Sequence, residues 1–199
     1  WTKIIMTGGS GVHLFIFLSG FGLGLSSQQL NIWLFYKKRF SKILIPYYIT
    51  IVIIYTINLF HPVYQDDGIY ALLGHLFLFK MFDNAIIVSF GTHFWFLSTI
   101  IQFYILFPII AACKKRTSNF NFAFGSILLS ALYWMTISFL NLSDRGTYQS
   151  AFLQFLWEFN LGLVLADLYK KENYKFWNIN PFLLAGLSIS GMAIMSLLA

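Results

Sequence analysis

The sequence predicts an all-α fold: a polytopic transmembrane bundle of about six helices plus one short interfacial helix, all in a single domain over residues 1–199. The first observation behind this is composition, because 58% of the 199 residues are hydrophobic and only 10% are charged. Soluble domains have about 25% charged residues. A chain of this length cannot hide so much apolar surface from water, so lipid must cover most of it.

The second observation is the spacing of apolar runs. A helix needs about 20 residues to cross the hydrocarbon, and helices pair their own backbone groups there. Six runs approach this length: residues 11–28, 43–60, 93–113, 120–140, 151–169 and 181–199. The apolar segment 69–82 is too short to cross, and an interfacial or re-entrant helix suits it better. Alternation with period two, which would indicate a membrane barrel, is absent from the sequence.

The third observation is the placement of charge. Ten of the 13 Lys and Arg residues follow the first, third and fifth runs, and alternating spans would bring these three clusters to one side. The positive-inside rule then places the clusters in the cytoplasm and the start of the chain outside. This accounts for the net charge of +6 without a nucleic-acid partner. The basic residues are Lys37, Lys38, Arg39, Lys42, Lys114, Lys115, Arg116, Lys170, Lys171 and Lys175.

Glu158 lies inside the fifth run and is the first candidate for chemistry. An ionisable group at membrane depth is costly and faces a cavity or a partner. Two interpretations remain open: a carboxylate that handles a proton, or a structural ion pair with a basic residue on another span. His13, at the outer end of the first run, is either a general base or a polar residue that bonds a neighbouring helix. His93 suits an interfacial cap.

Other candidates are weaker. Arg39 and Lys42 are three residues apart and would share a face in a helix, where a guanidinium could clamp phosphate; the alternative is a topology signal. Gly20 and Gly24 form a G-x-x-x-G pair that favours close helix packing or a backbone near a ligand. The spacing of the outer His and Asp residues does not indicate a metal site. Cys113 is the only cysteine, so no internal disulfide forms.

Four stretches, in order, resemble the acyltransferase 3 family of integral membrane acyltransferases. They are GGSGVHLFIFLSGFGLGLS (8–26), FYKKRFSKILIPYY (35–48), HFWFLSTIIQFYILFP (93–108) and WEFNLGLVLA (157–166). The resemblance implies transfer of an acyl group, often acetyl, from cytoplasmic acyl-CoA to a hydroxyl of an exported or cell-surface carbohydrate. It implies acyl-CoA binding by Arg39 and Lys42, and a cavity bordered by Ser19, Gly20 and Trp95. It also implies a multi-pass protein of the bacterial cytoplasmic membrane, and abundant Ile, Phe, Lys and Asn suggest an AT-rich bacterial genome.

Two departures from the family pattern qualify the site. The catalytic histidine of the family is expected in a span upstream of residue 1, so the 199 residues alone are expected to be inactive and His13 does not match that motif. Many members also have a glutamate five residues after the tryptophan of the third motif, where this chain has Ile100. Glu158 and His13 therefore stay open as separate catalytic candidates. A transporter or flippase for lipid-linked glycan, or an inactive scaffold, is the alternative function.

Overall fold

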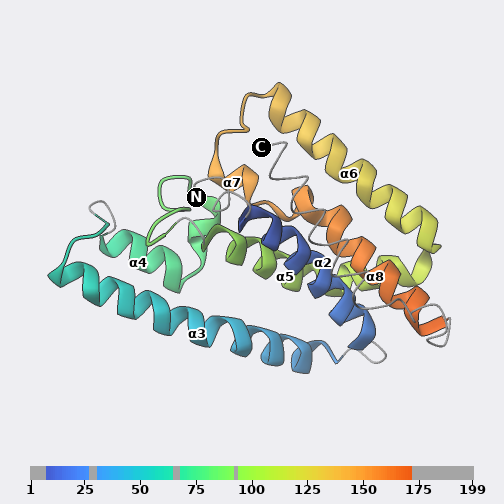
Figure 1. Cartoon of the computed structure of the whole chain (residues 1–199), viewed down its shortest axis with the longest axis horizontal. Helices are drawn as coiled ribbons and strands as arrows, with labels where there is room; N and C mark the ends of the chain where they lie inside the picture. Colours follow the sequence, from blue (N-terminus) through green and yellow to red (C-terminus); the bar gives the residue numbers. More distant parts are fainter. Residues whose placement is uncertain (1–7, 27–30, 65–67, 92–93, 172–199) are drawn as a thin grey trace. The chain divides into compact units, whose positions relative to one another are not determined.

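The computed structural model describes residues 8–26, 31–64, 68–91 and 94–171, and every regular element in these ranges is a helix (Figure 1). In chain order the elements are α2 (Gly8–Ser26), α3 (Ile32–Phe60), α4 (Ile69–Leu76), η1 (Phe79–Phe82), α5 (Trp95–Arg116), α6 (Asn119–Phe139), α7 (Gly146–Gln149), η3 (Phe152–Phe155) and α8 (Leu156–Lys171). The all-helical prediction is confirmed. The chain divides into two compact units, residues 1–28 with 158–199 and residues 29–157, which are described separately.

Four segments are long and apolar enough to cross a membrane: Ile32–Phe60, Trp95–Arg116, Asn119–Phe139 and Gly146–Lys171. The apolar part of α2, Gly11–Ser26, is shorter. The four agree with the second to fifth predicted spans, the first predicted span is an apolar helix of shorter length, and the predicted sixth, 181–199, lies outside the described residues. α4 has eight residues, so the prediction that segment 69–82 does not cross is also confirmed.

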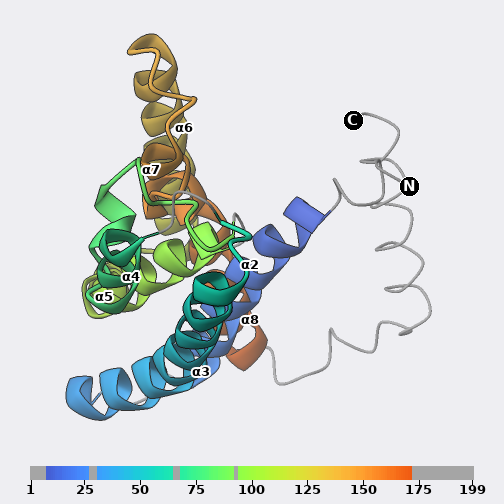
Figure 2. The same ribbon diagram turned by 90° about the vertical axis from the view of Figure 1, so that its left-hand side faces the viewer.

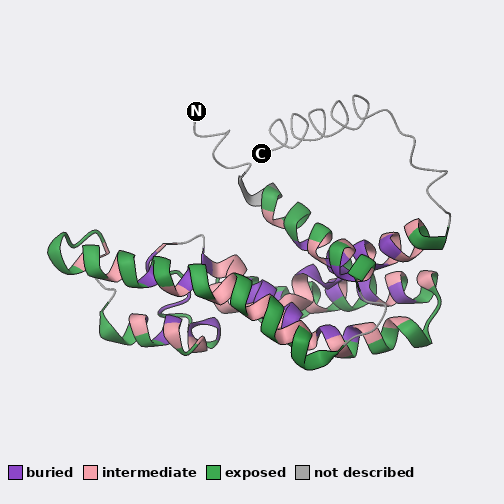
Figure 3. Ribbon diagram, turned by 90° about the horizontal axis from the view of Figure 1, so that it is seen from below, coloured by how far each residue is buried: buried purple, intermediate pink, exposed green. Residues whose placement is uncertain are grey.

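In the second unit, α3 packs beside α4 and α5 (Figure 1). Tyr47 and Ile51 of α3 are buried, whereas apolar residues on its other faces are exposed in the pattern that lipid requires. Figure 3 shows exposed positions along the long helices. α6 begins at Asn119 because the Ser118 side chain accepts a hydrogen bond from the Asn121 N–H and caps the helix. The segment through α7 and η3 then runs back along α6 (Figures 1 and 2).

The basic segment 37–42 lies between the predicted spans 11–28 and 43–60, whereas the structure includes it in a helix. It belongs to the first turns of α3, which begins at Ile32, eleven residues before the predicted span. Asn31 caps this start by accepting a hydrogen bond from the Leu34 N–H at 3.2 Å. A good cap and a run of aromatic residues that pack on α5 carry the helix back through the basic residues. The charged composition of residues 37–42 gave no apolar run, so the sequence did not indicate that the helix includes them.

Candidate functional site

The first unit is built on close contact between α2 and α8. A β-carbon at Gly20 would overlap the carbonyl oxygen of Phe159, and one at Gly162 would overlap the backbone of Phe17. Only glycine lets two helix backbones approach so closely. Gly24 meets Ala166 one turn further along, so the predicted role of the G-x-x-x-G pair in helix packing is confirmed.

The two helices run in the same direction, as the first and fifth spans of an alternating bundle must. His13 lies beside Glu158 near their starts, and the Lys170 ammonium donates a 2.8 Å hydrogen bond to the Gly24 carbonyl near their ends. This last contact satisfies one of the carbonyls that a helix leaves unpaired at its C-terminus. The contact therefore fixes the register of α2 against α8, and with it the position of His13 opposite Glu158.

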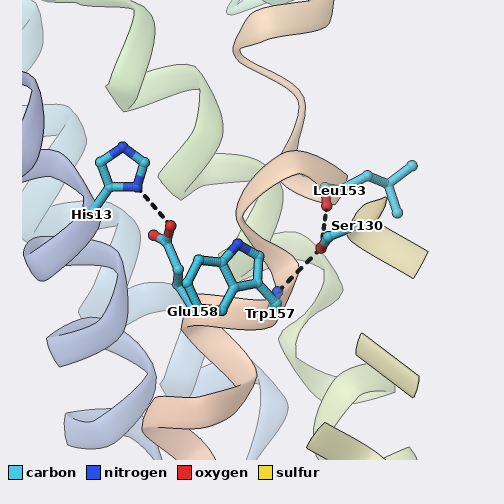
Figure 4. Close-up of polar contacts among 5 residues, drawn as sticks. All are labelled: His13, Ser130, Leu153, Trp157 and Glu158. Carbon is cyan, nitrogen blue, oxygen red and sulfur yellow. Dashed lines mark hydrogen bonds and ion pairs between the residues drawn. The ribbon is translucent and has the colours of Figure 1, made fainter. Parts of the chain in front are cut away.

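His13 and Glu158 are the two predicted site residues that the structure brings together (Figure 4). The imidazole Nδ1 lies 2.6 Å from the carboxylate Oε1, with 55% of the His13 side chain and 8% of the Glu158 side chain exposed. The other carboxylate oxygen, Oε2, is buried and has no hydrogen-bond partner among the described residues. One interpretation of Glu158 expected a basic residue on another span as its partner, and in the structure that residue is a histidine, a type of side chain that ordinarily titrates near neutral pH.

This geometry suits proton transfer. When the imidazole donates its Nδ1–H to a carboxylate, the tautomer is set and Nε2 is left as an acceptor that can take a proton. The carboxylate then stabilises the imidazolium that forms. Glu158 lies in the first turn of α8, twelve residues before Lys170. At about 1.5 Å per residue, the pair lies about 18 Å from the basic end of the helix, deep within a membrane-crossing segment.

Arg39 and Lys42 lie in the second unit, on α3, with different environments. The Arg39 guanidinium is half-buried and stands 5.9 Å from the centre of the Tyr104 ring on α5, whereas Lys42 is exposed. Tyr36 fastens this region by donating a 2.8 Å hydrogen bond to the Ile105 carbonyl. Neither cation forms an ion pair with a described acidic residue.

The three predicted cavity residues have separate surroundings. Trp95 is half-buried and stacks on Phe155, with ring centres 5.9 Å apart. Ser19 is half-buried on α2. Gly20 is buried against the α8 backbone, so it serves the helix contact rather than a cavity wall. The described residues contain no cluster of three metal-ligating side chains, and His93 lies outside them.

Sequence reasoning missed a buried polar network around His75. The Tyr47 hydroxyl lies 2.7 Å from Nδ1 and the Ser89 hydroxyl 2.8 Å from Nε2, and Ser89 donates in turn to the Ile86 carbonyl at 2.6 Å. The imidazole is therefore neutral, with its proton on Nε2. Burial, aided by the nearby charge of Lys80, lowers the pKa of His75 to about 3. The sequence signal was a histidine within an apolar run.

A second missed feature is a set of side chains inside the spans that bond backbone rather than one another. Thr99, Gln102 and Ser130 bond the chain between α7 and α8, where the helix is interrupted. The polar residues themselves were visible within apolar runs. Their partners were not, because backbone groups carry no signal in the sequence.

Comparison with known proteins agrees with this picture of a helical membrane protein. A family model described as an acyltransferase domain, Acyl_transf_3, matches residues 1–199. No curated protein and no solved structure matches the chain. The match covers every residue that carries the helices and the His13–Glu158 pair, and the chain therefore belongs to the acyltransferase 3 family of membrane acyltransferases.

Proposed function

We propose that this membrane acyltransferase moves an acyl group, in the first instance acetyl, from acyl-CoA to a hydroxyl of a cell-surface or exported glycan. The observation that carries the proposal is the 2.6 Å contact between His13 and Glu158. Acyl transfer to a hydroxyl requires a base beside the acceptor, and a histidine oriented by a buried carboxylate is such a base. A helix–helix bond between two neutral polar residues would require no ionisable group at this depth.

In this mechanism Nε2 of His13 takes the proton of the acceptor hydroxyl as its oxygen attacks the thioester carbonyl. The C–S bond breaks, the sulfur leaves as the thiolate of CoA, and the ester of the glycan forms. The imidazolium then returns its proton to the thiolate, which restores the free base and releases CoA–SH. Glu158 holds the Nδ1–H throughout and stabilises the transient positive charge.

The donor site in this proposal includes Arg39 and Lys42. The phosphates of CoA are anions, and guanidinium groups bind phosphate through paired N–H donors. Arg39 is held by the Tyr104 ring and has no ion pair with a described acid, so its charge is available to a ligand. The positive-inside rule puts this end of α3 in the cytoplasm, where acyl-CoA is made.

The acceptor in this proposal arrives from the opposite side, and the protein works in a bacterial cytoplasmic membrane. The His13–Glu158 pair lies toward the ends of α2 and α8 that are remote from Lys170, the predicted outer ends. A glycan that has already been exported or displayed reaches these outer ends without crossing the membrane again. A transferase so placed would pass only the acyl group across the membrane.

The proposal is tested with membranes that contain the full-length protein, acetyl-CoA and crude cell-surface glycan. Free CoA thiol is followed over time against membranes that lack the protein. We expect thiol release that needs both the protein and the glycan. If a panel of acyl-CoAs gives no release, while labelled lipid-linked glycan crosses the membrane only when the protein is present, the protein is a transporter and the proposal is wrong.

A further inference from the structure

The segment over residues 69–82 turns apolar side chains outward and polar side chains inward. The exposed apolar side chains of α4 and its C-cap include Ile69, Leu73 and Phe77, which are 67%, 40% and 74% exposed. They recur every four residues and therefore share one face of the helix. His75 and Lys80, by contrast, are buried. A helix against water shows the reverse pattern, so the exposed face of α4 fits hydrocarbon rather than water.

α4 runs back along α3 from the end of that helix (Figure 1). The Tyr48 hydroxyl on α3 donates a 3.0 Å hydrogen bond to the Leu76 carbonyl at the end of α4. Tyr48 lies twelve residues before Phe60, the last residue of α3, which is about 18 Å along the helix at about 1.5 Å per residue. Because α3 is long and apolar enough to cross the membrane, the end of α4 lies beside the middle of a membrane-crossing helix.

α3 leaves the same kind of surface uncovered at this level. Val52, Ile53 and Ile57 lie between Tyr48 and Phe60, and all three are exposed apolar side chains. Exposed apolar faces on two neighbouring elements, one of which crosses the membrane, form a surface whose contact with water is unfavourable. The lipid that covers α3 at this level is therefore in a position to cover α4 as well.

The backbone beyond α4 has partners within the protein. Hydrocarbon tolerates non-helical backbone only where protein groups pair its N–H and C=O groups. The Phe77 N–H donates to the Leu73 carbonyl at 2.9 Å, and the Asp83 N–H donates to the Lys80 carbonyl at 3.2 Å. The tyrosine bond to the last carbonyl of α4 adds a third such contact. These bonds meet the requirement of hydrocarbon at the places where α4 and η1 end.

Partly exposed polar groups gather at the other end of the segment. Tyr70, in the first turn of α4, donates a 2.6 Å hydrogen bond to one Asp83 carboxylate oxygen, and the Ala85 N–H donates to the other at 2.9 Å. Phe77 lies seven residues after Tyr70, which is about 10 Å further along the helix. The segment is thus polar near the end of α3, where a membrane-crossing helix meets the headgroups, and apolar where α4 ends.

We propose that residues 69–82 form a re-entrant segment that binds lipid acyl chains: α4 enters the bilayer beside the end of α3 and carries Phe77 into the hydrocarbon. The acyl chains that cover its exposed face belong to the leaflet on the side remote from the basic segment 37–42. An interfacial helix, the alternative that the sequence leaves open, would lie flat at one depth. The inference is independent of the proposed function, because it concerns only how this segment meets the membrane.

The test measures the depth of nitroxide spin labels in the full-length protein, reconstituted in vesicles of phosphatidylcholine and phosphatidylglycerol. Ile69→Cys, Leu73→Cys and Phe77→Cys are labelled one at a time in a cysteine-free background that includes Cys113→Ser. Relaxation of the label by oxygen, which concentrates in hydrocarbon, is compared with relaxation by a water-soluble nickel chelate. We expect the oxygen-to-nickel ratio to rise from position 69 through 73 to 77, because each step moves the label about 6 Å along α4.

Two further labels give the reference depths. Ile53→Cys, exposed on α3, should resemble position 77, and Val63→Cys, exposed in the loop after α3, should respond mainly to the nickel chelate. Ratios at positions 69, 73 and 77 that all match Val63→Cys place the segment in water and overturn the proposal. Equal ratios at the three positions also overturn it, because they describe a helix that lies flat. The measurement needs no acyl transfer, so its failure is distinct from a failure of the proposed function.

Discussion

The imidazole of His13 and the carboxylate of Glu158 lie 2.6 Å apart, although 145 positions separate them in the chain. Their meeting depends on two contacts between the same helices, the glycine contact at Gly20 and Gly162 and the bond from Lys170 to Gly24. The pair joins a largely exposed histidine to a buried acid. Such an arrangement orients the base and sets which of its two nitrogens faces the carboxylate.

The pair should act as a unit in catalysis. We expect His13→Ala and Glu158→Gln each to lower the initial rate of thiol release about a hundredfold or more, the usual contribution of a positioned base. The double variant should be no slower than the slower single variant, because each change removes the same function. Asp167→Asn, on the same helix but paired with Lys171, is the control and should keep full activity. Full activity of Glu158→Gln would show that the acid is dispensable.

The contact of α2 with α8 should be sensitive to a single methyl group at one position. Gly20→Ala places a β-carbon against the Phe159 carbonyl, so we expect it to lower the melting temperature in detergent. Overpacking of this kind costs about 1–3 kcal/mol. Gly22→Ala is the control, since nothing lies within 4 Å of its added carbon. Equal melting temperatures for the two variants would contradict the close helix approach.

The His75 network should make stability depend on pH. The pKa of His75 falls to about 3 in the folded protein from its ordinary 6.5, so between these values the unfolded chain binds more protons. Protonation then favours unfolding, and stability present above pH 6.5 is lost progressively as the pH falls toward 3. We expect the melting temperature of the wild type to fall over this range, and that of His75→Asn to fall less steeply. His61→Asn, at an exposed position, should follow the wild type.

Arg39 should contribute to donor binding more than its basic neighbours do. Its guanidinium is held over Tyr104, whereas Lys37 is exposed on the same helix. We expect Arg39→Ala to raise the KM for acetyl-CoA about tenfold, the effect of one lost charge-assisted contact. Arg39→Lys should recover part of the loss, because an ammonium keeps the charge without the planar donors. An unchanged KM in Arg39→Ala, matching the Lys37→Ala control, would leave Arg39 as a topology signal.

The orientation of the bundle is testable by labelling. In a Cys113→Ser background, a cysteine in place of Lys115 should react with an impermeant maleimide in inside-out vesicles and not in intact cells. A cysteine at position 118 would be a poorer choice, because the Ser118 hydroxyl caps α6. Val63→Cys, exposed in the loop after α3, should show the reverse pattern. Labelling of position 115 from outside intact cells would contradict the predicted topology.

The sequence alone determined the class of the protein, because hydrophobic composition, run length and charge placement reflect the bilayer, which acts on every residue independently of its neighbours. It therefore predicted the spans over residues 11–28, 43–60, 93–113, 120–140 and 151–169, and the close packing at Gly20 and Gly24. It also singled out Glu158, since a lone acid in an apolar run stands out whatever its surroundings. The family resemblance also rested on short stretches of consecutive residues, which can be recognised without knowledge of the fold.

Only the tertiary structure decided which residues meet. The sequence named His13 and Glu158 separately but could not pair them, because the register of α2 against α8 depends on backbone contacts at glycines. It left the basic segment outside the second span, because the aromatic packing of α3 on α5 that continues the helix is a contact between distant residues. The bonds of Gln102 and Ser130 to the interrupted span were hidden for a related reason. Their partners are backbone atoms, which every residue possesses, and only the folded chain selects which of them lie within reach.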